Sequence, residues 1–567
     1  MCKEGHGRVW PTLARLSRCN GVIIRRMDTS AANRLRSWKA IAGYLGCSVR
    51  TARRWEAEEA LPVHRLMHKS QGNVYAYPHE LDAWLKRDEV NEQRARNDVG
   101  EERASIAVLP FGFVGADADS AYIADGFTDE VIADLSKIRE LRVTSRTSSM
   151  ALKGSQLSAQ RMARALGVAM LLEGSVQKQS DKLRITVRLI DPDSEDTLWT
   201  DKYQGVLEDI FAIQERIARD VAEHLQVSLS NDDEQRLESR DVDNVDAWLL
   251  ATQAKHEGFR WRPDAIDRAV QLLEKAVELA GDRPALLAAL GRTWLHYREA
   301  GADLGPEPIE RARECAARIA AVDPGSPAGL QLSGWLKYAQ GDIQGAVHDL
   351  NAASQADITD VDSINLLVNC YLISGRVALA RPLIPRVLRL DPLLPVARCL
   401  PGWADSLEGK FDEAVEPYRS MYEMDPGNPV GRLFYLWALV SAGQNAEALS
   451  IIDGYSDDAA MSLPGQVARL FEAGLRGEGL VSDGGLSVDA ETAANTSDVI
   501  PRLLSQAYSL CGQTGLAIVW LGRAVERGFI NYPYIAHHDP LWESIREEPG
   551  FQVILRDVKQ RWERFDS

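Results

Sequence analysis

Apolar residues recur at helical spacing near the start of the chain. The residues that fall on one helix face are Trp38, Ile41, Ala42 and Leu45. Ser37 stands directly before them, where a hydroxyl can accept a hydrogen bond from a backbone amide of the first turn. The pattern therefore predicts a capped helix that buries this face.

A second short helix is expected over residues 49–57, after a break at Gly46 and Cys47. Small and apolar residues would face inward, and cationic and hydroxyl residues would face outward. The outward residues are Ser48 as the cap, Arg50, Thr51, Arg53 and Arg54. This arrangement is typical of a recognition helix that enters the major groove of DNA.

Two extended stretches, 63–67 and 73–77, flank a polar turn at 69–72, and a last helix is expected over 79–86. The segment "WKAIAGYLGCSVRTARRWE … ELDAWL" resembles winged helix-turn-helix modules of the MerR/excisionase type. The resemblance implies contacts to double-stranded DNA from the five helix residues above and from His64 and Lys69 on the wing. The alternative is a protein-docking module with solvated arginines.

Strand and helix patterns alternate between residues 104 and 230 and predict a mixed sheet covered by helices. Strands are expected at 105–111, 141–144, 169–177, 182–190 and 197–203, and helices at 122–138, 157–166 and 207–225. The stretches "SIAVLPF" and "ARALGVAMLLEGSVQKQSDKLRITVRLID" resemble the TolB-like (FlgO-related) amino-terminal domain of bacterial regulators. That resemblance implies no particular chemistry.

Two groups of charged residues in this domain are candidate sites. Asp125, Asp129 and Glu130 lie near a helix start, where carboxylates stabilise the helix dipole, although a metal or acid–base site is the alternative. Arg142, Arg146 and residues 145–149 either hold an anion or form a polar loop.

From residue 244 onward the chain is helical and repeats every 34 residues. The positions that reveal the period are Asp323, Asp357, Asp391 and Asp425, then Gly341, Gly375, Gly409 and Gly443, then Ala346, Ala380, Ala414 and Ala448. Three tryptophans, at 335, 403 and 437, share one further position of the repeat. A helix–turn–helix unit of this length is the tetratricopeptide repeat. Such repeats form a concave groove, in which we expect a protein or peptide partner.

These observations give a multidomain architecture: a winged helix-turn-helix, an α/β domain with a mixed sheet, and an all-α solenoid. The expected segments are a basic tail (1–30), the winged helix-turn-helix (31–88), a charged linker (89–103), the TolB-like domain (104–230), the repeats (240–530) and a capping segment (531–567). The start of translation is open between Met1 and Met27.

The net charge of −17 is unevenly distributed. Residues 1–97 hold 18 Lys and Arg against 10 Asp and Glu, a net charge of +8, and the remainder carries −25. A basic head on an acidic body fits contact with DNA by the head alone. Since a single winged helix binds weakly, we expect a homodimer on a two-part operator.

The seven cysteines are dispersed and form no CxxC motif, which favours reduced thiols in a cytoplasmic protein over a redox pair. Cys47, Cys370 and Cys399 fit apolar helix faces and are expected in the core. No apolar run approaches the length that spans a bilayer, so no membrane contact is expected.

His64 and His68 would lie about 13 Å apart on a strand, which disfavours zinc, and His537 and His538 are interpreted as structural. The chain contains no GxxxxGK[ST], GxSxG or HExxH motif and no recognisable kinase, cyclase or receiver segment. We therefore expect no catalytic residues, no cofactor, no metal and no enzymatic activity. The leading prediction is a cytoplasmic DNA-binding transcriptional regulator. The alternative is a protein-interaction scaffold with a docking winged helix.

Overall fold

The computed structural model describes residues 35, 37–44, 62–66, 73–77, 104–115, 122–179, 181–258, 260, 262–299, 303–357, 359–455, 460–477, 486–495 and 499–565. The chain divides into two compact units, Met1–Glu102 and Arg103–Ser567.

In the first unit, helix α1 (Trp38–Tyr44) packs against strand β2 (Asn73–Tyr75). The Ser37 hydroxyl accepts a hydrogen bond from the Ala40 amide at 3.1 Å, which confirms the predicted cap. Strand β1 (His64–Leu66) pairs antiparallel with β2, and Leu35 bridges to Ala76. The predicted second helix (49–57), turn (69–72) and last helix (79–86) lie outside the described residues, so the complete winged helix-turn-helix stays a prediction.

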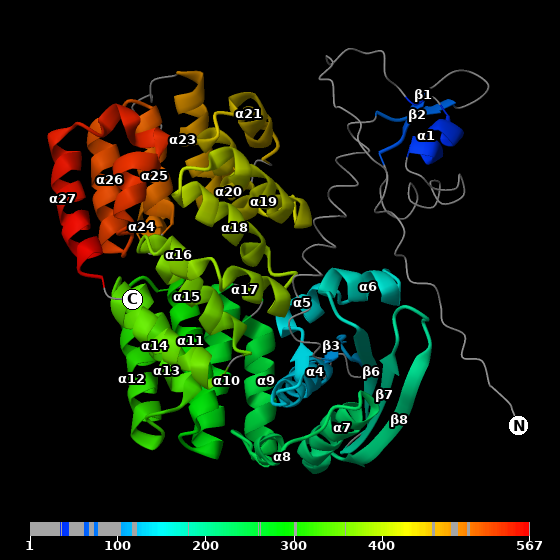
Figure 1. The fold of residues 1–567 in the computed structure, drawn as a ribbon. Coiled ribbons are helices and arrows are strands. Elements are labelled where there is room, and N and C mark those ends of the chain that lie inside the picture. The colour runs from blue at the N-terminus through cyan, green and yellow to red at the C-terminus, as the bar shows by residue number, and fades with distance from the viewer. Residues whose placement is uncertain are drawn as a thin grey trace, which may run out of the picture. The chain divides into compact units, whose positions relative to one another are not determined.

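A mixed sheet begins the second unit, as predicted, and it has six strands where the sequence indicated five (Figure 1). Its strands are β3 (Ala104–Val108), β4 (Gly112–Val114), β5 (Leu141–Val143), β6 (Met170–Gln179), β7 (Lys182–Ile190) and β8 (Thr197–Val206). The strand order is β5-β3-β6-β7-β8, with β4 also paired to β6. Pairs among β3, β4, β5 and β6 are parallel, whereas β6-β7 and β7-β8 are antiparallel.

Helices cover the sheet unequally. Helices α4 (Tyr122–Ser136) and α7 (Ile210–His224) share one apolar core with β3 and β5–β8. Helix α6 (Ala159–Leu166) packs on the other face, against β3 and the first residues of β6. The rest of that second face, along β6–β8, carries no helix among the described residues (Figure 1).

Three elements of this domain escaped the sequence pattern. Strand β4 is only three residues long, and helix α8 (Asn231–Glu238) is almost entirely polar. Helix α5 (Arg146–Ala151) occupies the stretch interpreted as an anion cradle or polar loop. Its sequence, RTSSMA, has no apolar periodicity that would predict a helix. The sequence indication of a helix here is Ser145, whose side chain accepts a hydrogen bond from the Ser148 amide and caps the helix.

Paired helices follow to the end of the chain. The first helices of the repeats are α9 (Val245–Gly258), α11 (Pro284–Glu299), α13 (Pro327–Ala339), α15 (Val361–Ile373), α18 (Pro395–Leu407), α20 (Pro429–Ser441), α23 (Leu463–Arg476) and α25 (Ile500–Leu510). The second helices are α10 (Pro263–Ala280), α12 (Glu307–Val322), α14 (Ile343–Ala356), α16 (Val377–Ala380) with α17 (Ile384–Leu390), α19 (Phe411–Met424), α21 (Asn445–Asp453), α24 (Val488–Ala494) and α26 (Thr514–Glu526).

The positions that recur every 34 residues, which we call the lattice, have definite structural roles. Its four glycines occupy the turn inside each repeat with φ between +70° and +80°, a conformation that disfavours other residues. Its four alanines are 0–1% exposed, because the two helices of a repeat approach closely there. Its four aspartates are the C-caps of the second helices.

Two further expectations concern cysteines and membranes. Cys370 and Cys399 are buried in the repeat core, as predicted, whereas Cys47 lies outside the described residues. Burial raises the pKa of the Cys399 thiol to about 12. Within the described part of the chain, no helix has the length and apolar character needed to cross a bilayer.

Candidate functional site

Of the seven residues expected to contact DNA, the structure describes one. Ser48, Arg50, Thr51, Arg53, Arg54 and Lys69 lie outside the described residues. His64, on β1, stacks on Tyr75 of β2 with ring centroids 5.1 Å apart, and Tyr77 meets both rings edge-on at 5.6 Å. These aromatic contacts fix the histidine ring on one face of the hairpin.

The first helices of the repeats form a surface that we call the inner face. The lattice position of the tryptophans lies on it, in α13, α18 and α20, and Asn369 takes the same position in α15. Trp437 is 1% exposed, and its indole N–H donates to Gln506 of α25 at 3.0 Å. Trp335 is half-buried, and its indole N–H has no hydrogen-bond partner among the described residues.

The C-terminal segment, residues 529–545, covers the inner face from α15 to α25. The Ile530 amide donates to the Ile373 carbonyl at 3.0 Å, and the Asn531 side chain donates to the Leu372 carbonyl at 3.0 Å. These contacts join residues about 160 positions apart in sequence to the C-terminal end of α15. The segment continues as a π-helical turn, η3 (Tyr534–His538), and a 3-10 helix, η4 (Pro540–Ile545).

A buried polar network holds this segment in place. Gln506 donates to Tyr534 Oη at 3.2 Å and to Asp539 Oδ2 at 2.5 Å, and Asp539 is 0% exposed. Trp542 donates its indole N–H to Ser505 Oγ at 2.9 Å. Burial raises the pKa of Asp539 above its ordinary value. The groove expected to receive a partner is therefore already occupied by the chain itself in its later repeats.

The last helix, α27 (Pro549–Glu563), completes the cover. Arg376, in the turn after α15, donates to the carbonyls of Trp562 and Phe565 at 2.7 and 2.8 Å, and its guanidinium lies 4.9 Å from the Trp562 ring centroid. His538 lies against the Gly409 turn, as a structural residue would.

The earlier repeats keep polar groups on a half-buried inner face. Arg292 of α11 pairs with Asp362 of α15 at 3.3 Å, and Asn369 donates to Tyr338 Oη at 2.5 Å. Burial, together with the neighbouring Arg292 charge, lowers the pKa of His296 to about 4. Of these three helices, α11 and α13 receive none of the hydrogen bonds above from the C-terminal segment, whereas α15 receives two at its C-terminal end.

The carboxylates of α4 contact the first repeat helix, α9. Asp129 pairs with Lys255 at 2.7 Å and with Arg146, and Asp125 pairs with Lys153 at 2.5 Å. The Trp248 indole donates to Glu130 at 3.1 Å, and burial raises the pKa of that carboxyl. These contacts favour the structural interpretation of the three carboxylates. Side chains of other elements, and not only the positive end of the α4 dipole, compensate their negative charge.

A glycine permits this approach. A Cβ atom at Gly126 would lie 2.2 Å from Thr252 Cγ2, so only glycine fits between α4 and α9 at this position. No group of three or more His, Cys, Asp or Glu side chains in the described ranges is arranged to hold a metal ion.

The second contact of the sheet domain with the repeats lies at α5. The Ser148 hydroxyl donates to the Asp391 carboxylate, the Leu393 amide donates to Ser148 Oγ at 2.8 Å, and the Ser145 amide donates to the Leu390 carbonyl at 2.8 Å. Asp391 is 1% exposed. The anion that α5 receives is thus a carboxylate of the same chain.

Asp391 differs from its lattice partners. Asp323, Asp357 and Asp425 are exposed, and each accepts from the amide two residues further on. The sequence contained a signal for this difference: "DPGSP" and "DPGNP" follow at 323 and 425, but "DPLLP" follows at 391. Leu393 packs against the core beneath α6.

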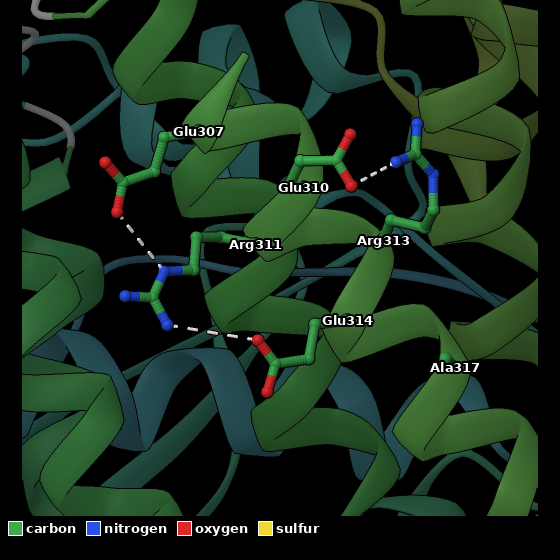
Figure 2. Close-up of a pocket in the computed structure, with 6 residues that line it drawn as sticks. All are labelled: Glu307, Glu310, Arg311, Arg313, Glu314 and Ala317. Atoms are coloured by element: carbon green, nitrogen blue, oxygen red, sulfur yellow. Dashed lines mark hydrogen bonds and ion pairs between the residues drawn. The ribbon is translucent and has the colours of Figure 1, made fainter.

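Two depressions in the repeats are weaker candidates for a binding site. A depression of about 480 Å³ is lined only by α12, where Arg311 pairs with Glu307 and Glu314 at 3.5 and 3.9 Å, and Arg313 pairs with Glu310 (Figure 2). A cavity of about 390 Å³ opens where the helix pair α16–α17 is interrupted near Pro382, between Leu367, Tyr371 and Arg386.

Comparison with known proteins gives two family matches. Residues 102–219 match the second domain of HilA/YgeH-like transcriptional regulators, and residues 407–466 match a tetratricopeptide repeat. The sheet domain is therefore HilA-like, and the helical region consists of tetratricopeptide repeats. The narrower resemblances, to MerR/excisionase-type modules and to the TolB-like domain, stay predictions.

Individual relatives cover part of the chain. A Rhizobium meliloti (strain 1021) protein named "Putative adenylate cyclase 3" is 35% identical over 188 residues, 33% of this chain and 32% of that protein. Transcriptional regulator HilA of Salmonella typhimurium (strain LT2) is 23% identical over 198 residues, 34% of each chain. The chain thus spans about a third of the length of the curated relatives it matches. A thermophilic TPR protein of Thermus thermophilus aligns with 34% of this chain and 99% of its own, at 20% identity and a TM-score of 0.29.

One expectation is contradicted. The lack of known catalytic motifs predicted a chain without enzymatic activity, but the similarity at 35% identity is to a protein named as an enzyme. Short motifs miss catalytic domains whose essential residues are dispersed along the sequence, so their absence was a weak basis for that prediction.

Proposed function

We propose that the chain is a DNA-binding transcriptional regulator whose repeats receive a protein or peptide partner. The observation that carries this proposal is the match of residues 102–219 to the second domain of HilA/YgeH-like transcriptional regulators. The segment before that match is basic and resembles a winged helix-turn-helix of the MerR/excisionase type. The cytoplasm, where DNA is accessible, is the proposed location.

In this proposal the residues that read DNA are Ser48, Arg50, Thr51, Arg53 and Arg54 on the recognition helix, with His64 and Lys69 on the wing. A homodimer would place two such helices on a two-part operator. The TolB-like interpretation of residues 104–230 belongs to the same proposal, since it assigns this domain to regulators.

The partner is proposed to bind the inner face of the early repeats. The later part of that face is filled by the C-terminal segment, whereas α11 and α13 present Arg292, Trp335 and Tyr338 on half-buried surface.

Selection of bound sequences from random duplex DNA tests the proposal. The native protein and an Arg50→Ala/Arg54→Ala variant are compared, with Lys275→Gln/Arg556→Gln as a control that also removes two positive charges. A motif recovered by the native and control proteins and lost in the first variant supports the proposal. Failure of all three proteins to enrich any sequence overturns it.

The similarity to the named adenylate cyclase favours a second candidate function, formation of cyclic AMP from ATP. Incubation of the purified protein with ATP and a divalent metal ion, followed by quantification of cyclic AMP, tests this candidate. Turnover above a heat-denatured control supports it, and its absence with both magnesium and manganese removes it.

A further inference from the structure

The second face of the β6–β8 sheet is basic, and no described helix of the second unit covers it. Side chains alternate along a strand, so those of β7 that do not enter the core all lie on this face. They include Lys182, Arg184 and Arg188, all exposed, and the register places Lys202 of β8 opposite Thr186 of β7. We call these four cations the basic sheet face.

The basic sheet face is unusual in its charge. The neighbouring carboxylate on the same face is Glu173, which pairs with Arg188 at 3.3 Å. Lys182, Arg184 and Lys202 make no ion pair with any residue that the structure describes. By contrast, residues 98–567 carry a net charge of −25. A cluster of exposed cations in an acidic unit marks a surface for an anionic partner.

The other side chains of this face indicate which kind of anionic partner it binds. Gln177 and Gln204 flank Arg184 on the neighbouring strands, and Ser175 lies opposite Thr186. Hydroxyl and amide groups beside Arg and Lys are the usual donors to DNA phosphates. Trp199 points to the opposite face, where it stacks on His224, so this face lacks the aromatic platform that single-stranded nucleic acid requires.

The dimensions also suit a duplex. From Lys182 to Arg188 the strand extends about 20 Å, and adjacent strands are about 4.8 Å apart. The cations therefore form a strip that can meet several phosphates of one backbone. An acidic protein is less favoured, because protein interfaces normally centre on buried aromatic or aliphatic anchors, and the middle of this strip has none.

We propose that the basic sheet face binds the phosphate backbone of double-stranded DNA, outside the bases read by the winged helix. The inference rests on the proposed function, since it adds a second contact to the same DNA. It assigns to the HilA-like domain a role in affinity and not in sequence selection.

The test compares full-length native protein, Arg184→Gln/Lys202→Gln, and the charge-matched control Lys275→Gln/Arg556→Gln. Each is titrated with a short duplex that holds the selected site alone and with a longer duplex that adds flanking sequence. The native and control proteins should bind the longer duplex more tightly. The sheet variant should lose that gain, keep its affinity for the short duplex, and show a slope of log affinity against log salt smaller by about 2.

Equal binding of the longer duplex by the sheet variant and the control overturns the inference. The inference is also overturned if the sheet variant keeps its DNA binding but loses binding to an acidic protein. The face is then assigned to that protein. If the selection finds no site, random-sequence duplex at low salt is the probe, with Arg50→Ala/Arg54→Ala as a further protein. If Arg184→Gln/Lys202→Gln loses this binding and Arg50→Ala/Arg54→Ala keeps it, the inference is supported although the proposed function has failed. If Arg184→Gln/Lys202→Gln keeps this binding, the inference is overturned.

Discussion

The early and late halves of the repeat solenoid use one sequence lattice to build two different inner faces. In the late half, Trp437 is buried and donates to Gln506, which in turn contacts Tyr534 and Asp539 of the C-terminal segment. In the early half, the equivalent Trp335 is half-buried, and its indole N–H has no hydrogen-bond partner among the described residues. The same holds for Trp403 of α18, so the contrast lies between Trp437 and the two tryptophans before it. The lattice determines how helices pack against their neighbours, but not what covers the face they form.

The difference indicates where a partner can bind. A groove that the chain fills with its own residues is closed to a peptide unless that segment leaves, at the cost of exposing a large apolar surface. The early half needs no such step. The predictions that follow test this contrast, from the largest expected effect to the smallest.

Removal of a central anchor of the C-terminal segment should cost far more than removal of an early tryptophan. Trp542 is 0% exposed and bonded to Ser505, so Trp542→Ala should lower the free energy of unfolding by about 3–5 kcal/mol. Trp335→Ala should cost about 1 kcal/mol. Urea-induced unfolding followed by circular dichroism measures both. Equal losses would contradict the contrast between the halves.

The buried Asp391, which contacts α5, should contribute more to stability than the exposed Asp425 at the equivalent position of its repeat. Asp391→Ala leaves the buried Ser148 hydroxyl without its acceptor, so we expect a loss of about 1–3 kcal/mol. Asp425→Ala removes an exposed turn contact and should cost about 0.5 kcal/mol. Thermal unfolding compares the two variants, and faster proteolysis next to the sheet domain in Asp391→Ala alone would locate the damage. A larger loss in Asp425→Ala would show that the docking contributes little.

The smallest effect concerns pH and the early half. The pKa of His296 is about 4 in the folded protein and 6.5 in its ordinary state, so the unfolded chain binds the additional proton between these values. Its contribution to stability is therefore complete above pH 6.5 and is lost as the pH falls toward 4. His296→Gln should flatten the stability profile in this range. An unchanged profile would mean that His296 is protonated without strain in the folded state.

Sequence patterns predicted the mixed sheet, the repeat lattice and the Ser37 cap because each depends on local periodicity or on one residue type at one position. They did not predict the closed groove or the docking of Asp391, since both depend on contacts between distant segments. Signals for both exist in retrospect: "DPLLP" replaces polar turn residues with leucines, and "IPRLLSQAYSL" forms a helix whose residues are almost all buried. Of the DNA-contact residues, only His64 can be placed, so those assignments rest on the sequence.

Within the described ranges, the sheet domain contacts the solenoid at α9 and at residues 390–393, and the repeats between these points form a closed ring with it. In an open array, a change of curvature is shared by many independent interfaces and is gradual. Here any change of curvature between the two contacts strains one of them until it breaks. A ligand that bends this stretch would consequently act as a threshold device, with no response at low strain and release of the HilA-like domain once a contact fails.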